Sequence, residues 1–294
     1  MLHKLRAVTR AKLNLSLEVI RKRRDGFHEI ETIFQSVDLC DDVHLDLTED
    51  GDVTVACTHP GIPTDASNLC HRAIVAMRPY AGESLGARIR LVKRIPAGSG
   101  LGGGSANAAG VMLAVNHAFK LQLSMPRLET IAADLGSDVP FMLHGGTMLG
   151  RGRGEILTPL EPLQDAFFLI VRPPISISTA WVYENFKLTL TRHRPRINLR
   201  AVNAVFARFP EATMSFRNAL EDVVCPAYPA ISGVLDELLS TQPCFASMTG
   251  SGSALYAVYE SQAKAAKLAE RFSVRGFFTS VARPAKRAVD IFED

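Results

Sequence analysis

A glycine-rich stretch in the first half of the chain carries residues that could hold a phosphate group. It reads RIPAGSGLGGGSANAAG over residues 94–110, and five of the seven residues from Gly98 to Gly104 are glycine. Such a cluster is typical of a backbone that bends sharply or lets a ligand approach closely, because glycine has no side chain in the way. The alternative is a flexible linker, since linkers are also rich in Gly and Ser.

The flanking residues favour an anion site over a linker. Residues 87–95 (ARIRLVKRI) alternate between apolar and basic types, which predicts a strand. After the glycines, we expect Ser105 to be the N-cap of a helix that is rich in Ala and Leu. A helix N-terminus presents unpaired N–H groups and a positive dipole end, so the order strand, glycine loop, helix predicts a phosphate or other anion site.

The two familiar phosphate-loop patterns fit this stretch poorly. Gly98, Gly100 and Gly103 match G-x-G-x-x-G, but we find no convincing βαβ unit around them. The Walker A pattern requires a lysine where Gly104 stands. A triphosphate held here would therefore be met mainly by backbone amides and by cations from elsewhere in the chain.

Charged residues in two other segments are candidates for that chemistry. In AKLNLSLEV (residues 11–19), Lys12 and Asn14 lie on the polar face of a predicted strand, which could line a cleft or could simply be half-exposed. Asp138 is predicted in the first turn of a helix opened by Ser137, where a carboxylate either accepts a proton or only complements the helix dipole. A second glycine loop, TGSGS at 249–253, could clamp a phosphate or form a plain hairpin.

The coarse pattern of elements is α+β. We expect strands over 5–20, 29–39, 43–48, 53–57 and 87–95, with a helix after Ser67 and helices after Ser105, Ser124 and Ser137. The second half predicts a strand at AFFLIVRPP, helices near 179–186, 198–208 and 226–240, and then strands 244–248, 254–259 and 277–282 around a helix at 261–272. A soft boundary between 155 and 170 divides the chain into predicted domains 1–160 and 161–294.

Composition excludes several functional classes. With 294 residues, 47% hydrophobic content and a net charge of +3, the chain is an ordinary globular protein without the basic surface of a nucleic-acid binder. The five cysteines form no C-x-x-C pair and the histidines show no metal-ligand spacing. The longest apolar run is far too short to span a bilayer, and no targeting peptide is visible. We therefore expect a cytoplasmic protein with no membrane or nucleic-acid partner.

Taken in order, AKLNL, PAGSGLGGGSANAA and TGSGS resemble the three motifs of the GHMP kinase superfamily. More narrowly, RDGFHEIET, LGSDVPFML and GEILTPL are similar to the family of 4-diphosphocytidyl-2-C-methyl-D-erythritol kinases, ATP-dependent enzymes of isoprenoid precursor biosynthesis. The resemblance spans nearly the whole chain. It implies an N-terminal domain like the second domain of ribosomal protein S5, a ferredoxin-like C-terminal domain and an active site between them.

The resemblance also implies roles for particular residues. It implies that Asp138 is the base for the substrate hydroxyl with Lys12 beside it, and that ATP binds with Mg²⁺, for which no protein ligand is assigned. The implied ATP-binding residues are Asn68, Lys93, Pro96, Ala97, Gly98, Ser99, Gly100, Leu101, Gly102, Gly103, Gly104, Ser105 and Ala106. The implied substrate-binding residues are Asn14, Phe27, His28, Thr179, Tyr183, Gly250, Ser251 and Gly252.

Two departures from the family concern the aromatic residues that are expected to flank the cytosine. The family usually has Tyr where this chain has Phe27, and Phe where it has Tyr183. Stacking survives either exchange, because both rings have a π-face. The alternatives are another GHMP kinase, acting on homoserine or a mevalonate derivative, and a non-catalytic nucleotide- or RNA-binding protein. The partner is expected to be a small molecule, and the chain a monomer or homodimer.

Overall fold

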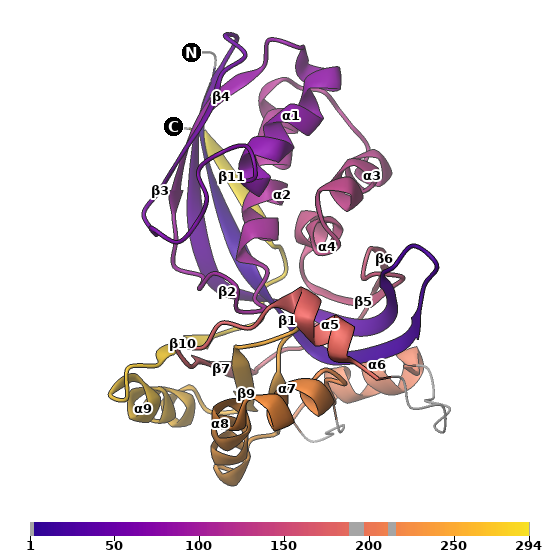
Figure 1. Cartoon of the computed structure of the whole chain (residues 1–294), viewed down its shortest axis with the longest axis vertical. Coiled ribbons are helices and arrows are strands. Elements are labelled where there is room, and N and C mark those ends of the chain that lie inside the picture. Colours follow the sequence, from indigo (N-terminus) through magenta and orange to yellow (C-terminus); the bar gives the residue numbers. More distant parts are fainter. Residues whose placement is uncertain (1–2, 188–196, 211–215, 294) are drawn as a thin grey trace.

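The structure is a computed structural model that describes residues 3–187, 197–210 and 216–293, and its larger part is built on a seven-stranded sheet (Figure 1). The strand order is β11-β1-β2-β4-β3, with β5 beside β2 and β6 beside β5. All neighbours are antiparallel except β3 and β4. The strands are β1 (His3–Lys22), β2 (His28–Thr48), β3 (Val53–Cys57), β4 (Gly86–Val92), β5 (Thr147–Arg151), β6 (Ile156–Pro159) and β11 (Val289–Glu293).

Four helices cover one face of this sheet (Figure 1). They are α1 (Leu69–Ala81), α2 (Gly103–Ala118), α3 (Met125–Leu135) and α4 (Val139–His144). The small residues of α2 let it lie close against β1: a Cβ placed on Gly110 would be only 2.6 Å from Cγ2 of Thr9. The apolar faces of these elements form one buried core, which fixes the N-terminus of α2 at the lower edge of the sheet in Figure 1.

A smaller, four-stranded antiparallel sheet lies below the first in Figure 1, in the order β10-β7-β9-β8. Its strands are β7 (Phe167–Arg172), β8 (Phe245–Met248), β9 (Leu255–Tyr259) and β10 (Phe278–Ala282). One face packs with α8 (Pro229–Ser240) and α9 (Gln262–Ser273), and the other packs on β1, β2 and α6 (Leu199–Ala207). Two short helices, α5 (Thr179–Asn185) and α7 (Glu221–Ala227), complete the described elements.

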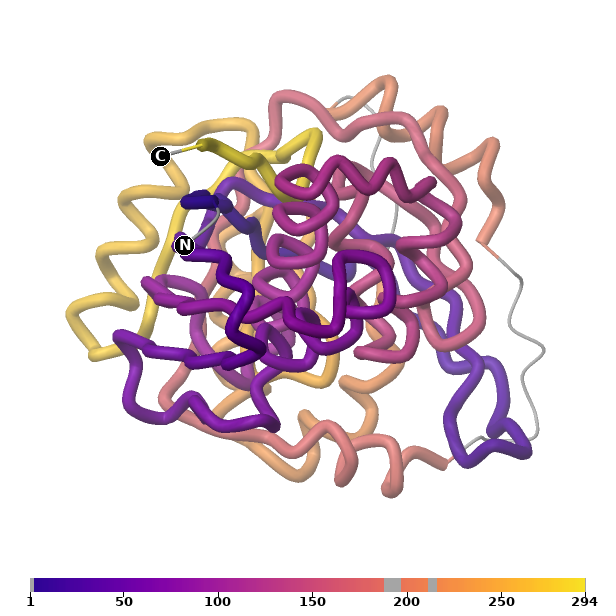
Figure 2. The backbone as a smooth tube through the Cα atoms, turned by 90° about the horizontal axis from the view of Figure 1, so that it is seen from above, coloured from indigo at the N-terminus to yellow at the C-terminus, as the bar shows by residue number. Residues whose placement is uncertain are grey.

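The last strand returns to the first sheet. β11 pairs with β1 from Leu5 to Thr9, so the two ends of the described chain lie together (Figure 2). We keep the division after residue 160 as a proposal, with the amendment that Val289–Glu293 belongs to the N-terminal sheet. In the described part of the chain, no helix combines the length and the apolar character that crossing a membrane needs.

Several element predictions need correction. The strands expected at 29–39 and 43–48 are one continuous strand, β2. The turn EDGD joins β2 to β3, but β4 lies between the two strands and pairs with both. The helix expected at 226–240 breaks at Tyr228, because the residue before a proline is driven out of the helical region and Pro229 follows. The predictions omitted β5, β6 and β11, which have only four or five residues each.

Candidate active site

A cavity of about 860 Å³ gathers most of the predicted site residues, and its lining includes residues of β1, β2, α1, α5 and both glycine loops. Three predicted site residues, Leu101, Ala106 and Gly252, do not line the cavity. Leu101 and Ala106 are fully buried, and the Leu101 carbonyl accepts a hydrogen bond from the Lys12 backbone at 3.0 Å. The predicted residues that do line it are Lys12, Asn14, Phe27, His28, Asn68, Lys93, Pro96, Ala97, Gly98, Ser99, Gly100, Gly102, Gly103, Gly104, Ser105, Asp138, Thr179, Tyr183, Gly250 and Ser251.

The glycine loop runs from the end of β4 to the start of α2. Gly98, Gly100 and Gly102 have φ values of +60°, +81° and +71°. Side chains rarely adopt such values, so the sharp path of the loop depends on glycine. The N-cap of α2 is Gly102 and its first residue is Gly103, so the prediction that Ser105 is the N-cap is wrong. Ser105 instead lies in the first turn of α2, whose residues Gly103, Gly104 and Ser105 line the cavity. The first N–H groups of a helix have no partner within it, which makes this end suitable for an anion.

The second glycine loop, Thr249–Ser253, is built against the first. A Cβ on Gly100 would lie 2.2 Å from the Thr249 carbonyl oxygen, so there is no room for a side chain between the loops. Beside this contact, the Ala254 N–H donates to the Ser99 carbonyl at 3.1 Å. The loops therefore form one continuous wall, made from segments 150 residues apart in the chain.

A buried asparagine that the sequence analysis missed supports this second loop. Asn218 is fully buried, and its Nδ2 donates to the carbonyls of Met248 and Gly250 at 2.8 and 2.7 Å. Next to it, Glu221 accepts hydrogen bonds from the Ser247 hydroxyl and the Met248 N–H, each at 2.7 Å. Burial raises the pKa of Glu221 above its ordinary value. Asn218 lies in a stretch between elements with no motif of its own, so only the fold reveals its contacts.

Lys12 and Asp138 meet on the wall of the cavity. Lys12 Nζ lies 3.5 Å from Oδ2 of Asp138 and 2.5 Å from Oδ1 of Asn14. The lysine side chain is 3% exposed and the aspartate side chain 33% exposed, so the carboxylate faces the open space while the ammonium is held behind it. The prediction that β1 brings Lys12 and Asn14 to a cleft agrees with this placement, and the alternative of a half-exposed strand is wrong here.

The alternative role for Asp138, stabilising a helix end, finds only partial support. Asp138 is the N-cap residue of α4, one position earlier than predicted, but its side chain makes no capping hydrogen bond. A carboxylate at this end still interacts favourably with the helix dipole. Because the usual cap contact is missing, the carboxylate is available to a ligand in the cavity.

Aromatic and polar side chains line the other end of the cavity. The rings of His28 and Tyr183 stack with centroids 5.2 Å apart, and Thr179 Oγ1 lies 2.7 Å from Ser251 Oγ of the second glycine loop. Burial, followed by the charge of nearby Lys22, lowers the pKa of His28. Burial, with the charge of Asp138 as a second cause, raises the pKa of Tyr183. Both rings are therefore neutral near pH 7.

Phe27 and Tyr183, which the resemblance implies on either side of the cytosine, both line the cavity. Phe27 is 51% exposed at the rim, and the guanidinium of Arg153 lies over its ring at 4.9 Å. Arg153 and Lys22 also line the cavity, and the sequence analysis assigned neither to the site. Arg153 lies in the turn between β5 and β6, two strands that were not predicted, so no sequence signal pointed to it.

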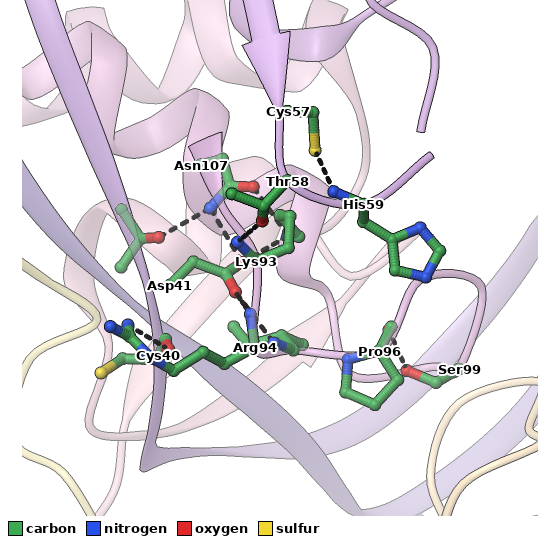
Figure 3. A network of polar contacts seen from close by, with 12 residues as sticks. Cys40, Asp41, Cys57, Thr58, His59, Lys93, Arg94, Pro96, Ser99 and Asn107 are labelled. Carbon is green, nitrogen blue, oxygen red and sulfur yellow. Dashed lines mark hydrogen bonds and ion pairs between the residues drawn. The ribbon is translucent and has the colours of Figure 1, made fainter. Parts of the chain in front are cut away.

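Asn68 and Lys93 line the cavity, but their polar groups are bonded within the protein. Asn68 is the N-cap of α1: its Oδ1 accepts from the Cys70 N–H at 2.8 Å. Lys93 is in an ion pair with Asp41, which is fully buried, and donates to Oδ1 of Asn107 at 2.8 Å (Figure 3). These internal contacts hold the parts of the cavity wall that Asn68 and Lys93 form.

The described residues contain no group of three or more His, Cys, Asp and Glu side chains able to hold a metal ion. Mg²⁺ does not require such a group, because in phosphoryl-transfer sites it keeps several waters and is bound by substrate phosphates with few protein ligands. The Ser105 hydroxyl, on the first turn of α2 in the cavity, is a suitable oxygen ligand. The site therefore fits a magnesium ion that arrives with its nucleotide.

Comparison with known proteins identifies the family. The pattern of the GHMP kinases N terminal domain matches residues 68–146, and that of the GHMP kinases C terminal domain matches residues 206–276. The chain is 37% identical to the 4-diphosphocytidyl-2-C-methyl-D-erythritol kinase of Geobacter sulfurreducens, over 93% of this chain and 96% of that relative. The chain belongs to the GHMP kinase family.

Solved structures agree with this membership. A crystal structure of 4-(cytidine 5'-diphospho)-2C-methyl-D-erythritol kinase superimposes with a TM-score of 0.78 at 29% identity, covering 95% of this chain and all of that one. Homoserine kinase from Cytophaga hutchinsonii gives a TM-score of 0.75 at 19% identity over 99% of this chain and 98% of that one, which shows the shared fold alone. The predicted α+β, two-domain GHMP kinase fold is confirmed, and the chain is an ATP-dependent kinase.

Proposed function

We propose that this GHMP kinase transfers the γ-phosphoryl group of ATP to the 2-hydroxyl of 4-diphosphocytidyl-2-C-methyl-D-erythritol. The observation that carries the proposal is the position of the Lys12–Asp138 pair. It lies on a wall shared with the N-terminus of α2, which suits phosphate, and the same cavity holds the His28–Tyr183 stack, which suits a cytosine. The similarity to kinases named for this substrate supports the same choice.

In this proposal, the glycine loop and the first turn of α2 bind the phosphates of ATP through backbone N–H groups. Mg²⁺ bound with the nucleotide neutralises phosphate charge, and the Ser105 hydroxyl would be its protein ligand. Such sites act mainly by positioning the reactants and stabilising charge, because phosphoryl transfer demands little covalent chemistry of the protein. The continuous wall of the two glycine loops therefore matters as much as any single side chain.

Asp138 and Lys12 act on the hydroxyl. As the substrate oxygen bonds to the γ-phosphorus, the bond from that phosphorus to the β,γ-bridging oxygen breaks and ADP leaves. The Asp138 carboxylate takes the hydroxyl proton, and the Lys12 ammonium offsets the charge that develops on the reacting oxygens. Asn14 positions Lys12, because its Oδ1 accepts from Nζ while its Nδ2 donates to Oγ1 of Thr32 at 2.8 Å.

Substrate recognition falls to the other end of the cavity. We assign the cytosine to the His28–Tyr183 stack, with Phe27 at the rim, and the diphosphate to the second glycine loop near Thr179. We also propose that the enzyme works in the cytoplasm. Its five cysteines are free thiols, in keeping with a reducing compartment.

The test is ADP production from ATP and Mg²⁺ with the cytidine substrate, run beside homoserine, mevalonate and galactose. We expect turnover with the cytidine substrate alone. Turnover with homoserine or mevalonate and none with the cytidine substrate would assign this chain to another member of the family, whose fold it shares. ³¹P NMR of the product identifies the new monoester and distinguishes transfer from simple ATP hydrolysis.

A further inference from the structure

The carboxylate of Asp41 lies behind the glycine loop, outside the residues assigned to the cavity, and its contacts converge on the two ends of that loop (Figure 3). Asp41 belongs to β2 and is fully buried. Its Oδ1 accepts from the backbone N–H groups of Arg94 and Ile95 at 2.7 and 2.8 Å. These two residues directly precede Pro96, where the loop begins.

The other oxygen of the same carboxylate reaches the far end of the loop. Oδ2 accepts from the Lys93 ammonium and, at 3.1 Å, from Nδ2 of Asn107, which lies on α2 one turn after the helix starts. Asn107 closes the network, because its Oδ1 accepts from Lys93 at 2.8 Å and its Nδ2 also donates to Thr9 Oγ1 at 2.7 Å. One carboxylate therefore ties β2, the stem of the loop and helix α2 together.

The network also places the Lys93 ammonium beside the anion-binding end of α2. A Cβ built on Gly103, the first residue of the helix, would lie 3.1 Å from Lys93 Nζ. The lysine side chain is 3% exposed and Asp41 is not exposed at all, so solvent screens this ion pair little. A buried charge without its partner is strongly unfavourable, which keeps Lys93 in this orientation whether or not a ligand is present.

We propose that Asp41 is the positioning residue of the ATP site: it fixes both ends of the glycine loop, so that the backbone N–H groups are preformed for phosphate. Lys93 then serves as part of this tie, with its charge already matched by Asp41. This inference rests on the proposed function, because it takes the glycine loop to be the ATP cradle. A preformed cradle loses less conformational freedom when it binds its ligand, so loosening the cradle weakens ATP binding and leaves binding of the second substrate unchanged.

The main test compares Asp41→Asn with a matched control, Glu31→Gln. Asparagine keeps one acceptor for the loop N–H groups but turns an NH₂ group toward Lys93 and Asn107. Glu31, like Asp41, is a buried carboxylate outside the cavity. It accepts from Arg151 Nε at 2.8 Å and from the Ile197 backbone N–H. The readouts are ATP affinity by calorimetry, the two KM values and the melting temperature.

We expect Asp41→Asn to lower the affinity for ATP about tenfold or more, since small misplacements of binding groups reduce binding and rate by such factors. The KM of the cytidine substrate and kcat at saturating ATP should change less than about twofold, as should ATP affinity in Glu31→Gln. We compare the double variant Asp41→Asn/Lys93→Met with the single variants Asp41→Asn and Lys93→Met. The double variant should bind ATP no more weakly than whichever single variant binds ATP more weakly, because the two residues act as one unit. Parental ATP affinity in folded Asp41→Asn, or equal losses for both substrates, would overturn the inference.

Asn107→Ala keeps the test decisive if Asp41→Asn does not fold. It cuts the link to α2 and leaves the Asp41–Lys93 ion pair in place, so we again expect weaker ATP binding with an unchanged KM for the second substrate. Parental ATP affinity in Asn107→Ala would overturn the proposal. Failure of the proposed function looks different: the parent chain itself would then show no ATP binding or no turnover of the cytidine substrate.

Discussion

Replacing Asp138 by asparagine is the most direct test of the proposed chemistry. Asparagine keeps the shape of the side chain and its hydrogen-bonding reach, but it cannot take a proton. General-base catalysis contributes about 10²–10⁴-fold, so we expect kcat to fall by that factor while the KM of both substrates changes little. The decrease should appear in single-turnover experiments as well, because the step removed is the chemical one.

The structure indicates that this variant will fold. At 3.5 Å, Lys12 and Asp138 attract by about 5 kcal/mol at an effective dielectric constant of about 20, before a reduction for the 33% exposure of the aspartate. Without that attraction, the Lys12 ammonium still donates to Asn14 Oδ1 and lies 5.6 Å from the centre of the Phe34 ring. The buried charge is therefore not left without a partner.

Helix stabilisation predicts the opposite result. If Asp138 only complements the dipole of α4, its loss costs about 1 kcal/mol or less, which for a chain of this size lowers the melting temperature by about 2 °C. Turnover of the folded fraction would then be normal. Measuring kcat and the melting temperature on one preparation of Asp138→Asn separates the two roles, and normal turnover with a lowered melting temperature would refute the assignment of the base.

A double-mutant cycle with Lys12→Met tests whether the pair acts as one unit. Methionine retains the aliphatic stem of the lysine, which packs closely on Gly102: a Cβ there would lie 3.0 Å from Lys12 Cγ. We expect Lys12→Met to lower kcat as well, and the double variant to lose much less than the product of the two single losses. Losses that multiply would show that the two residues act independently.

Three further variants test the remaining parts of the site. Gly103→Val should raise the KM of ATP sharply and leave the KM of the second substrate unchanged, because the added Cβ would lie 2.9 Å from the Ile95 side chain. Gly233→Val is the control, since a Cβ at that position would have nothing within 4 Å. Parental ATP binding in Gly103→Val would exclude the glycine loop as the ATP-binding site. Tyr183→Ala should weaken the cytidine substrate tenfold to a hundredfold, as stacking contributes about 1–3 kcal/mol, and an equal loss for ATP would point to misfolding. Burial lowers the pKa of His28, so the imidazole stays neutral as the pH falls through about 6.5, the ordinary pKa of histidine. The KM of the cytidine substrate should therefore rise only at more acidic pH. If the same rise occurs in His28→Gln, His28 is not its cause.

The motifs that carry the chemistry could be predicted from the sequence because each is local. A glycine loop between a strand and a helix is recognisable without the rest of the fold, and Asp138 precedes a helix that its own neighbours define. The contact between Gly100 and Thr249 could not be predicted, because it joins two loops that are 149 residues apart in the chain. Pairing of β11 with β1 is non-local in the same way, and five residues of sequence contain too little pattern to reveal it.

The break that was expected in β2 shows how a local conflict in the sequence marks a functional position. The segment SVDLCDDVHL contains two adjacent aspartates, Asp41 and Asp42, and acidic residues are depleted in strands. In the structure the strand continues, since cations from elsewhere neutralise both carboxylates: Lys93 pairs with Asp41, while Arg6 and Arg94 both pair with Asp42 at 2.8 Å. Natural sequences usually agree with their fold at every level, and departures concentrate at functional sites. Two adjacent aspartates in a buried strand are such a departure, and one of them holds the loop that we propose binds ATP.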